Sequence, residues 1–267
     1  AWDGGHVIWL AQGIAAEFPL AAEPADFWQT WERLQAEGFD LAIQPTRGRR
    51  KAVLLADMDS TMIEQECIDE LAAALGIKDQ VAEITERAMR GELDFEAALD
   101  TRVALLEGLE RRVVEDVRRE RITLAPGGRA LIQTMKAFGA YTALVSGGFT
   151  LFAEHFAKRI GFDEFAANVL EFDAEGRLTG TVEKPIVDKN TKRNRLMALT
   201  AERQLKTAQT MAVGDGANDL DMLALAGSGV ALHAKPTVAA QARMRIDHGD
   251  LTALLYLQGY RRAEFAA

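Results

Sequence analysis

The amino-acid sequence predicts an α/β fold, a Rossmann-like doubly wound parallel sheet with an inserted helical cap domain. Short apolar runs that end in polar or glycine-rich turns predict buried strands. Helical patterns lie between these runs, and strands that alternate with helices form parallel sheets covered on both faces. A longer helical stretch separates the first two runs, and it predicts the cap.

The predicted strands are apolar runs that do not alternate polar and apolar residues, as a half-buried strand would. They span residues 52–56, 141–145, 210–213 and 229–232. Helical patterns cover residues 128–138 and 151–159. Residues 168–172 and 177–182, joined by a turn at Gly176, predict a β-hairpin attached to the sheet.

The stretch between the first two predicted strands contains three helical patterns. Their apolar faces are Ile68, Leu71 and Leu75; Val81, Ile84 and Ala88; and Phe95, Leu99 and Val103. An insertion at the carboxyl end of a strand lies over the crevice in which open α/β sheets bind ligands. We therefore predict an amino-terminal segment of unknown role at 1–46, a catalytic core at 47–66 and 124–267, and a helical cap at 67–123.

Composition and charge argue against several kinds of partner. The 267 residues carry a net charge of −9, whereas binding to nucleic acid needs a basic face. We expect no membrane partner, because no apolar run is long enough to cross a bilayer and no basic residues precede the apolar stretch 6–16 as in a signal peptide. The single cysteine, Cys67, favours a reducing, cytoplasmic location. The sequence gives no indication of the oligomeric state.

Two aspartates, Asp57 and Asp59, directly follow the first predicted strand. Their mutual repulsion must be relieved by a cation or by protonation of one of them. Both arrangements suit phosphoryl transfer, in which an ionised aspartate attacks phosphorus and its neighbour carries the proton for the leaving group. Alone, the pair also fits a polar strand end that caps a turn. An EF-hand is excluded, because Met62 and Ile68 occupy its glycine and glutamate positions.

The next two predicted strands also end in polar turns. Ser146-Gly147-Gly148 would let a hydroxyl and backbone N–H groups approach an anion, although it also fits a simple tight turn. The loop 214–221 is rich in carboxylate and amide oxygens, which suits a hard cation such as Mg²⁺, although it also fits an acidic loop without metal. It is not a dinucleotide fingerprint, because Asp219 replaces the third glycine. For the cation that neutralises phosphoryl oxygens we predict Lys192, with Lys189 as the alternative.

Together these motifs resemble the haloacid dehalogenase superfamily of phosphatases, which combine an aspartate pair, a Ser or Thr, a Lys and a late acidic motif. Within it, the chain is similar to the branch that hydrolyses phosphoserine. That similarity rests on Asp57-Met58-Asp59-Ser60-Thr61-Met62 with Glu66, on Ser146-Gly147-Gly148, and on Gly214-Asp215-Gly216-Ala217-Asn218-Asp219. It covers about residue 50 to the end, and the first 46 residues match less clearly.

The resemblance implies a role for each matching residue. Asp57 would be the nucleophile and Asp59 the general acid and then base. The Asp57 carboxylate, the Asp59 backbone carbonyl and Asp215 would bind Mg²⁺, with Asp219 supporting them. The phosphate would be held by Ser146, Gly147, Lys192 and Asn218. In the cap, Glu66 would bind the substrate ammonium and Arg102 its carboxylate, with Met89 and Phe95 lining the pocket.

The position of Arg102 gives modest independent support, because it falls on the Phe95 and Ala98 side of its predicted helix, where a charge needs a partner. An arginine that extends its charged end to solvent is the alternative.

The predicted function is therefore Mg²⁺-dependent hydrolysis of O-phospho-L-serine through an aspartyl phosphate, as a step in serine biosynthesis. The alternatives are a related phosphatase or phosphotransferase for another small phosphomonoester, and a non-catalytic metabolite sensor. Sensors with this fold usually lack the nucleophile or the metal-binding acid, whereas Asp57, Asp59 and Asp215 are all present here.

Overall fold

The computed structural model describes residues 2, 5–89 and 93–266, and within α3 it leaves out the side chains at positions 86, 88 and 89. The predictions for the side chains of Ala88 and Met89 therefore lie outside the described residues.

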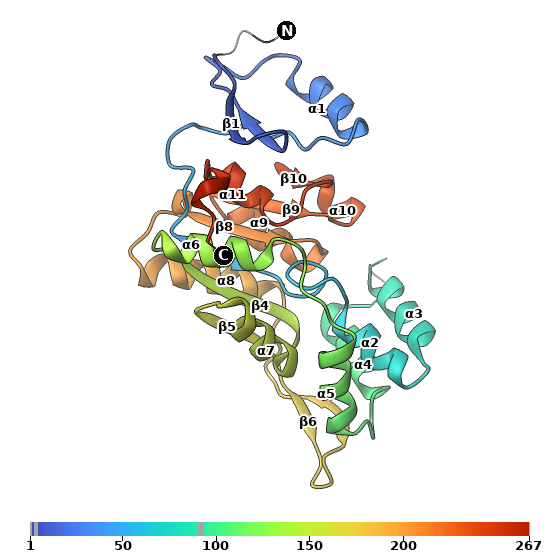
Figure 1. Ribbon diagram of the computed structural model, residues 1–267. Helices are drawn as coiled ribbons and strands as arrows, with labels where there is room; N and C mark the ends of the chain where they lie inside the picture. Colours follow the sequence, from blue (N-terminus) through green and yellow to red (C-terminus); the bar gives the residue numbers. More distant parts are fainter. Residues whose placement is uncertain (1, 3–4, 90–92, 267) are drawn as a thin grey trace.

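The core of the molecule is a six-stranded sheet in the order β10-β9-β8-β3-β4-β5 (Figure 1). All neighbouring strands run parallel, which confirms the predicted doubly wound α/β fold. The strands are β3 (Val53–Ala56), β4 (Tyr141–Phe149), β5 (Glu164–Asn168), β8 (Thr210–Gly214), β9 (Ser228–Leu232) and β10 (Met244–Ile246).

Helices cover both faces of this sheet because successive strand side chains point to opposite sides. On β3, Leu54 and Ala56 belong to one buried apolar cluster, and Val53 and Leu55 belong to the other. The first cluster includes residues of α6 (Gly128–Ala137), α7 (Thr150–Ile160) and α11 (Ala253–Leu257). The second includes residues of α8 (Lys189–Glu202), α9 (Leu220–Leu225) and the short helix α10 (Pro236–Ala239).

The chain order reverses at β3, which pairs with β4 on one side and with β8 on the other. Such a reversal leaves a crevice at the carboxyl ends of the strands, where open α/β sheets bind ligands. The predicted catalytic residues lie at this edge.

The predicted insertion between β3 and β4 is helical. It forms α2 (Cys67–Ala74), α3 (Lys78–Met89), α4 (Phe95–Ala104) and α5 (Arg111–Glu120). The last of these helices was missed, because only Val114 and Val117 are buried among its many charged residues. Leu75, expected on a buried face, is 40% exposed, because α2 ends before it and Gly76 turns the chain with a positive φ.

The predicted hairpin is β6 (Leu170–Phe172) paired antiparallel with β7 (Leu178–Val182). It forms a separate two-stranded sheet that contacts the cap, instead of an attachment to the main sheet as we predicted. The Leu178 backbone accepts from Gly108 N (2.8 Å) and donates to Leu109 O (2.9 Å). Residue 168 belongs to β5 of the main sheet.

The amino-terminal segment forms a small hairpin, β1 (Ile8–Ala11) with β2 (Ala15–Glu17), and one helix, α1 (Phe27–Ala36). It is joined to the core through Asp40, whose carboxylate accepts hydrogen bonds from the backbone N–H groups of residues 247–249. The division of the chain into three parts stays a prediction. Within the described residues, no helix combines the length and apolar character needed to span a membrane.

Candidate active site at the carboxyl edge of the sheet

Asp57 lies directly after β3 and is 5% exposed. Its backbone N–H donates to Val213 O (3.0 Å), which extends the pairing of β3 with β8 by one residue. The Asp57 Oδ1 atom accepts a hydrogen bond from Met58 N (2.7 Å) and lies 2.7 Å from Lys192 Nζ. Among the described residues, both contacts fall on Oδ1, so the other carboxylate oxygen stays available for chemistry.

Lys192 lies on α8, is fully buried, and bridges two carboxylates. Its Nζ atom lies 2.7 Å from Asp57 Oδ1 and donates to Asp219 Oδ1 at 2.7 Å. Burial alone would lower the pKa of Lys192, but Asp219 and Asp57 outweigh it and raise the pKa. The ammonium is therefore fixed in its charged form. Of the two lysines considered from sequence, Lys192 lies at this site and Lys189 is exposed at the start of the helix.

Asp219 organises the loop after β8. Its Oδ2 atom accepts hydrogen bonds from Asp215 N (3.1 Å) and Gly216 N (3.0 Å), and its Oδ1 atom accepts from Lys192. Gly214 is required beneath it, since a Cβ at that position would lie 2.4 Å from the Asp219 carboxylate. Both carboxylate oxygens of Asp219 therefore already have hydrogen-bond donors. This is expected of a residue that supports the metal ligands and is not itself the main ligand.

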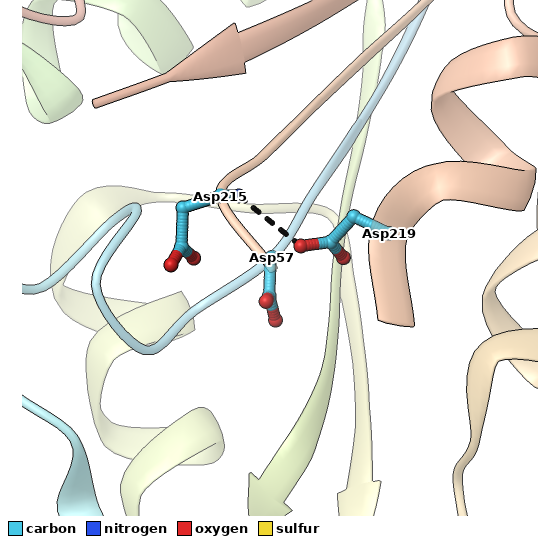
Figure 2. Close-up of side chains that lie close together, drawn as sticks. All are labelled: Asp57, Asp215 and Asp219. Carbon is cyan, nitrogen blue, oxygen red and sulfur yellow. Dashed lines mark hydrogen bonds between the residues drawn. The ribbon is translucent and has the colours of Figure 1, made fainter. Parts of the chain in front are cut away.

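Asp57, Asp215 and Asp219 form a buried cluster that could hold a metal ion (Figure 2). One oxygen from each lies within 4.8 Å of the others. Carboxylate oxygens suit hard cations, and one buried ammonium does not neutralise three carboxylates. Burial, with Asp57 and Asp219 nearby, raises the pKa of Asp215 to about 8. A bound cation would relieve this repulsion, so the donor set fits a metal.

The Asp59 side chain faces a different environment from that of Asp57. Its Oδ1 atom accepts from Cys67 N (2.8 Å), and its Oδ2 atom accepts from Ser146 Oγ (3.1 Å). Burial raises the pKa of Asp59 to about 7, and the Glu66 and Asp57 carboxylates add to this shift. A carboxyl group with this pKa can give up and regain a proton near neutral pH.

The turn Ser146-Gly147-Gly148 lies next to Asp59, inside β4, because the strand runs on to Phe149 instead of ending at residue 145 as predicted. Ser146 Oγ accepts a hydrogen bond from Gly148 N (2.8 Å), which closes the turn. A Cβ at position 148 would come within 2.4 Å of Asp59 Oδ2, so only glycine allows this approach. Asn218 also borders the turn, because a Cβ atom added at position 147 would lie 3.8 Å from Asn218 Nδ2.

The cap brings further predicted residues to this turn. A Cβ atom added at position 147 would lie 3.1 Å from the Phe95 ring, so the ring packs against Gly147. Glu66, at the start of α2, accepts a hydrogen bond from Ser60 Oγ (2.8 Å). These contacts place the amino ends of α2 and α4 over the edge of the sheet.

Arg102 is half-buried in the cap, where its Nε atom donates to Ala98 O (3.1 Å) and its Nη1 atom donates to Thr85 Oγ1 (3.3 Å). Burial lowers the pKa of Arg102, and Glu66 is the nearby carboxylate that counters this most. The guanidinium therefore lies within electrostatic reach of the site.

Sequence reasoning missed two side chains that contact the cluster. Thr61 is fully buried and donates from Oγ1 to Asp215 Oδ1 (3.2 Å). Lys235 Nζ lies 3.8 Å from Asp215 Oδ2 and 3.9 Å from Glu66 Oε1. Lys235 comes shortly after β9, and the other site residues were found by inspecting the carboxyl ends of the parallel strands. The same inspection of β9 would have found Lys235.

A family model for haloacid dehalogenase-like hydrolases matches residues 54–224. A phosphoserine phosphatase from Streptomyces coelicolor is 46% identical over 234 residues, which cover 87% of this chain and 57% of that protein. The chain spans about half the length of the first two curated relatives that it matches. It also spans 87% of a phosphoserine phosphatase from a Polaromonas species, at 46% identity over 75% of this chain.

Solved structures agree with these sequence matches. A HAD family hydrolase from Salmonella enterica serovar Typhi superposes with a TM-score of 0.83 at 34% identity, over 91% of this chain and 83% of that one. A phospho-aspartyl intermediate analogue of phosphoserine phosphatase superposes with a TM-score of 0.72 at 37% identity, over 78% of this chain and 98% of that one. The chain belongs to the haloacid dehalogenase-like hydrolase family.

Proposed function

We propose that this chain hydrolyses O-phospho-L-serine to L-serine and phosphate through a phosphoryl group carried on Asp57, with Mg²⁺ as its cofactor. The observation that carries the proposal is the pair of differently placed aspartates, with Asp57 against Lys192 and Asp59 against Ser146. Phosphoserine phosphatases among the relatives support the substrate, and the phospho-aspartyl analogue supports the intermediate.

In the first transfer, the Asp57 carboxylate attacks phosphorus and the bond from phosphorus to the serine oxygen breaks. Asp59, protonated near neutral pH because its pKa is raised to about 7, gives its proton to the departing serine oxygen. In the second transfer, the Asp59 carboxylate takes a proton from water, the water oxygen bonds to phosphorus, and the bond from phosphorus to the Asp57 oxygen breaks, which releases phosphate. Lys192 and the turn at Ser146 stabilise the phosphoryl oxygens in both steps.

The residues that would hold the Mg²⁺ ion are Asp57, Asp215 and the backbone carbonyl of Asp59. When bound, the ion supplies positive charge next to the phosphoryl oxygens. The support for a metal is the buried carboxylate cluster and the raised pKa of Asp215.

Substrate choice would come from the cap. Glu66 would bind the ammonium group of phosphoserine and Arg102 its carboxylate, with Phe95 lining the pocket. The Phe95 ring beside Gly147 and the Ser60 contact that orients Glu66 support this assignment. Asn218, which borders the same turn, would help to hold the phosphate.

A panel of small phosphomonoesters, assayed for phosphate release with Mg²⁺ and with EDTA, tests the proposal. We expect phosphoserine to be the preferred substrate and EDTA to abolish turnover. A preference for another ester would indicate the alternative phosphatase, and the appearance of a phosphorylated acceptor alcohol would indicate a phosphotransferase. Absence of turnover with every ester would favour a metabolite sensor.

Arg102→Ala separates substrate recognition from the chemical step. We expect kcat/KM for phosphoserine to fall by about 100-fold, because the substrate carboxylate loses its charged partner. Turnover of an aryl phosphate should change by less than about three-fold. Arg112→Ala is the matched control, since this cap arginine is 86% exposed. Equal losses for both substrates would contradict the role of Arg102.

We also propose a cytoplasmic location, supported by the single cysteine, Cys67, which is buried as a free thiol. Fractionation of cells that express the protein would test this location.

A further inference from the structure

Asn168 is a buried amide with no assigned role, and hydrogen bonds hold both ends of it. The residue closes β5 and is 2% exposed. Its Nδ2 atom donates to Gly147 O (2.8 Å), and its Oδ1 atom accepts from Val187 N (2.7 Å). An amide carries its donor and its acceptor on two separate atoms, so Asn168 can hold two backbone groups that lie on different sides of it.

The Gly147 contact fixes the turn proposed to hold phosphate. The pairing of β4 with β5 joins Val145 to Ala166 and then Phe149 to Asn168. Between these two pairs, β4 advances by four residues while β5 advances by two. Residues 146–148 therefore bow out of the sheet as a bulge, which needs support from outside the ladder. The Gly147–Gly148 peptide receives it at both ends, because Asn168 binds its carbonyl and Ser146 Oγ accepts from its N–H.

The Val187 contact reaches the second element proposed to hold phosphate. Val187 directly precedes Asp188, the residue that caps the amino end of α8 by accepting from Thr191 N (2.8 Å). Lys192 lies in the first turn of that helix. The Asn168 amide therefore joins the Ser146-Gly147-Gly148 bulge of β4 to the segment that leads into the lysine helix.

These two elements would contact the same phosphoryl group from different sides, so their separation decides how well the group is held. A shift of a few tenths of an ångström in either element changes hydrogen-bond lengths at a charged ligand. Asn168 makes no hydrogen bond to Asp57 or Lys192 in the described structure, so its effect would pass through the two backbone groups that it holds.

We propose that Asn168 is a positioning residue for the phosphoryl group, which sets the Ser146-Gly147-Gly148 turn relative to the Lys192 helix. The inference rests on the proposed function only in taking the bound anion to be the phosphoryl group of a phosphomonoester. It makes no use of the serine part of the substrate.

Two variants test this role. Asn168→Asp keeps the acceptor for Val187 N and loses the donor to Gly147 O. Asn168→Ser is uncharged, so a similar loss in both variants excludes simple repulsion of phosphate by the new carboxylate. We expect the inhibition constant of inorganic phosphate, and KM for an aryl phosphate and for phosphoserine alike, to rise about ten-fold in both variants, which corresponds to one buried hydrogen bond.

Asn190→Ser is the matched control, because this exposed amide donates to Asp188 (2.8 Å) at the same helix end and does not reach the turn. It should leave all three constants within two-fold of wild type. Melting temperatures are measured alongside, since a purely structural Asn168 would lower stability without changing the phosphate constant of the folded protein. That result, with constants within two-fold of wild type in both Asn168 variants, would overturn the inference.

The wild-type protein offers a measurement that does not depend on a variant folding. On titration with inorganic phosphate, the side-chain amide resonance of Asn168 should shift in the NMR spectrum while that of Asn190 stays in place. An Asn168 resonance that does not respond would contradict the inference. If phosphoserine proves not to be a substrate, the aryl phosphate and inorganic phosphate measurements still decide the role of Asn168.

Discussion

The carboxyl edge of the main sheet and the amino-terminal segment differ in what they bury. At the edge, Lys192 and Asp219 are fully buried, although a buried charge is costly unless it is paired. In the segment, apolar side chains lie in solvent, with Ile14 76% exposed and Trp28 53% exposed. The edge therefore retains an arrangement that packing alone would not favour, which is typical of a functional site. In the described part of the segment, no charged side chain is buried.

The two regions also differ in how they are held. Charged groups at the edge pair with one another and with backbone N–H groups of the same loop. The segment is attached to the core by the contacts of Asp40 with residues 247–249 and by the ion pair of Arg49 with Glu17. We therefore expect changes at the edge to affect stability and chemistry together, and changes in the segment to affect stability alone.

The largest expected effect is that of Lys192→Met. It leaves Asp57 and Asp219 buried without their ammonium, so we expect the free energy of unfolding to fall by about 3–5 kcal/mol and phosphate release to be lost. Urea denaturation and the phosphate assay measure the two effects. Lys189→Met, on the exposed face of the same helix, should stay within about 0.5 kcal/mol. A stable and active Lys192→Met variant would contradict the claim that the buried charges at the sheet edge support both stability and chemistry.

Divalent metal should have the next largest effect, and it should depend on pH. The pKa of Asp215 is raised to about 8, so the metal-free folded state binds an extra proton between about pH 4 and pH 8 and loses stability as pH rises through this range. Mg²⁺ at 100 times its dissociation constant should restore about 2.7 kcal/mol. The rise in melting temperature on adding Mg²⁺ to EDTA-treated protein should be larger at pH 8 than at pH 6. An equal rise at both pH values would show that Mg²⁺ binding does not displace a proton from Asp215.

Asp40→Ala should have a smaller effect, and only on stability. The change removes the acceptor for the backbone N–H groups of residues 247–249, which we expect to cost about 1–2 kcal/mol. Turnover at saturating phosphoserine should stay within two-fold of wild type. A large loss of activity in a folded Asp40→Ala protein would show that the segment is coupled to the site.

Ile14→Ser should have the smallest effect. The side chain is 76% exposed, so we expect a change within about 0.5 kcal/mol and no change in activity. Phe27→Ser is the contrasting variant, because this side chain is 2% exposed in the same segment. Similar melting temperatures for the two variants would indicate that the segment contributes nothing to the cooperative unit.

The regions also differ in how far the sequence predicts them. Buried strands such as 53–56 and 210–214 carry uninterrupted apolar runs, and the residues at their carboxyl ends lie at one edge, so Asp57, Ser146 and Asp215 were found together. The helix α5 was missed because Arg and Glu outnumber its two buried valines. Asn168 was missed because its role depends on a bulge opposite and on Val187, 19 residues away, and no local pattern encodes these contacts.

The most direct test of the central claim is to find the phosphoryl group on Asp57. Protein mixed with labelled phosphoserine and Mg²⁺ is quenched in acid within one turnover, and its peptides are mapped by mass spectrometry. We predict one phosphoryl group on the peptide that contains Asp57, none in Asp57→Asn, and loss of phosphate release in that variant while its fold is kept. Turnover that continues in Asp57→Asn, or label on another residue, would contradict the covalent role of Asp57.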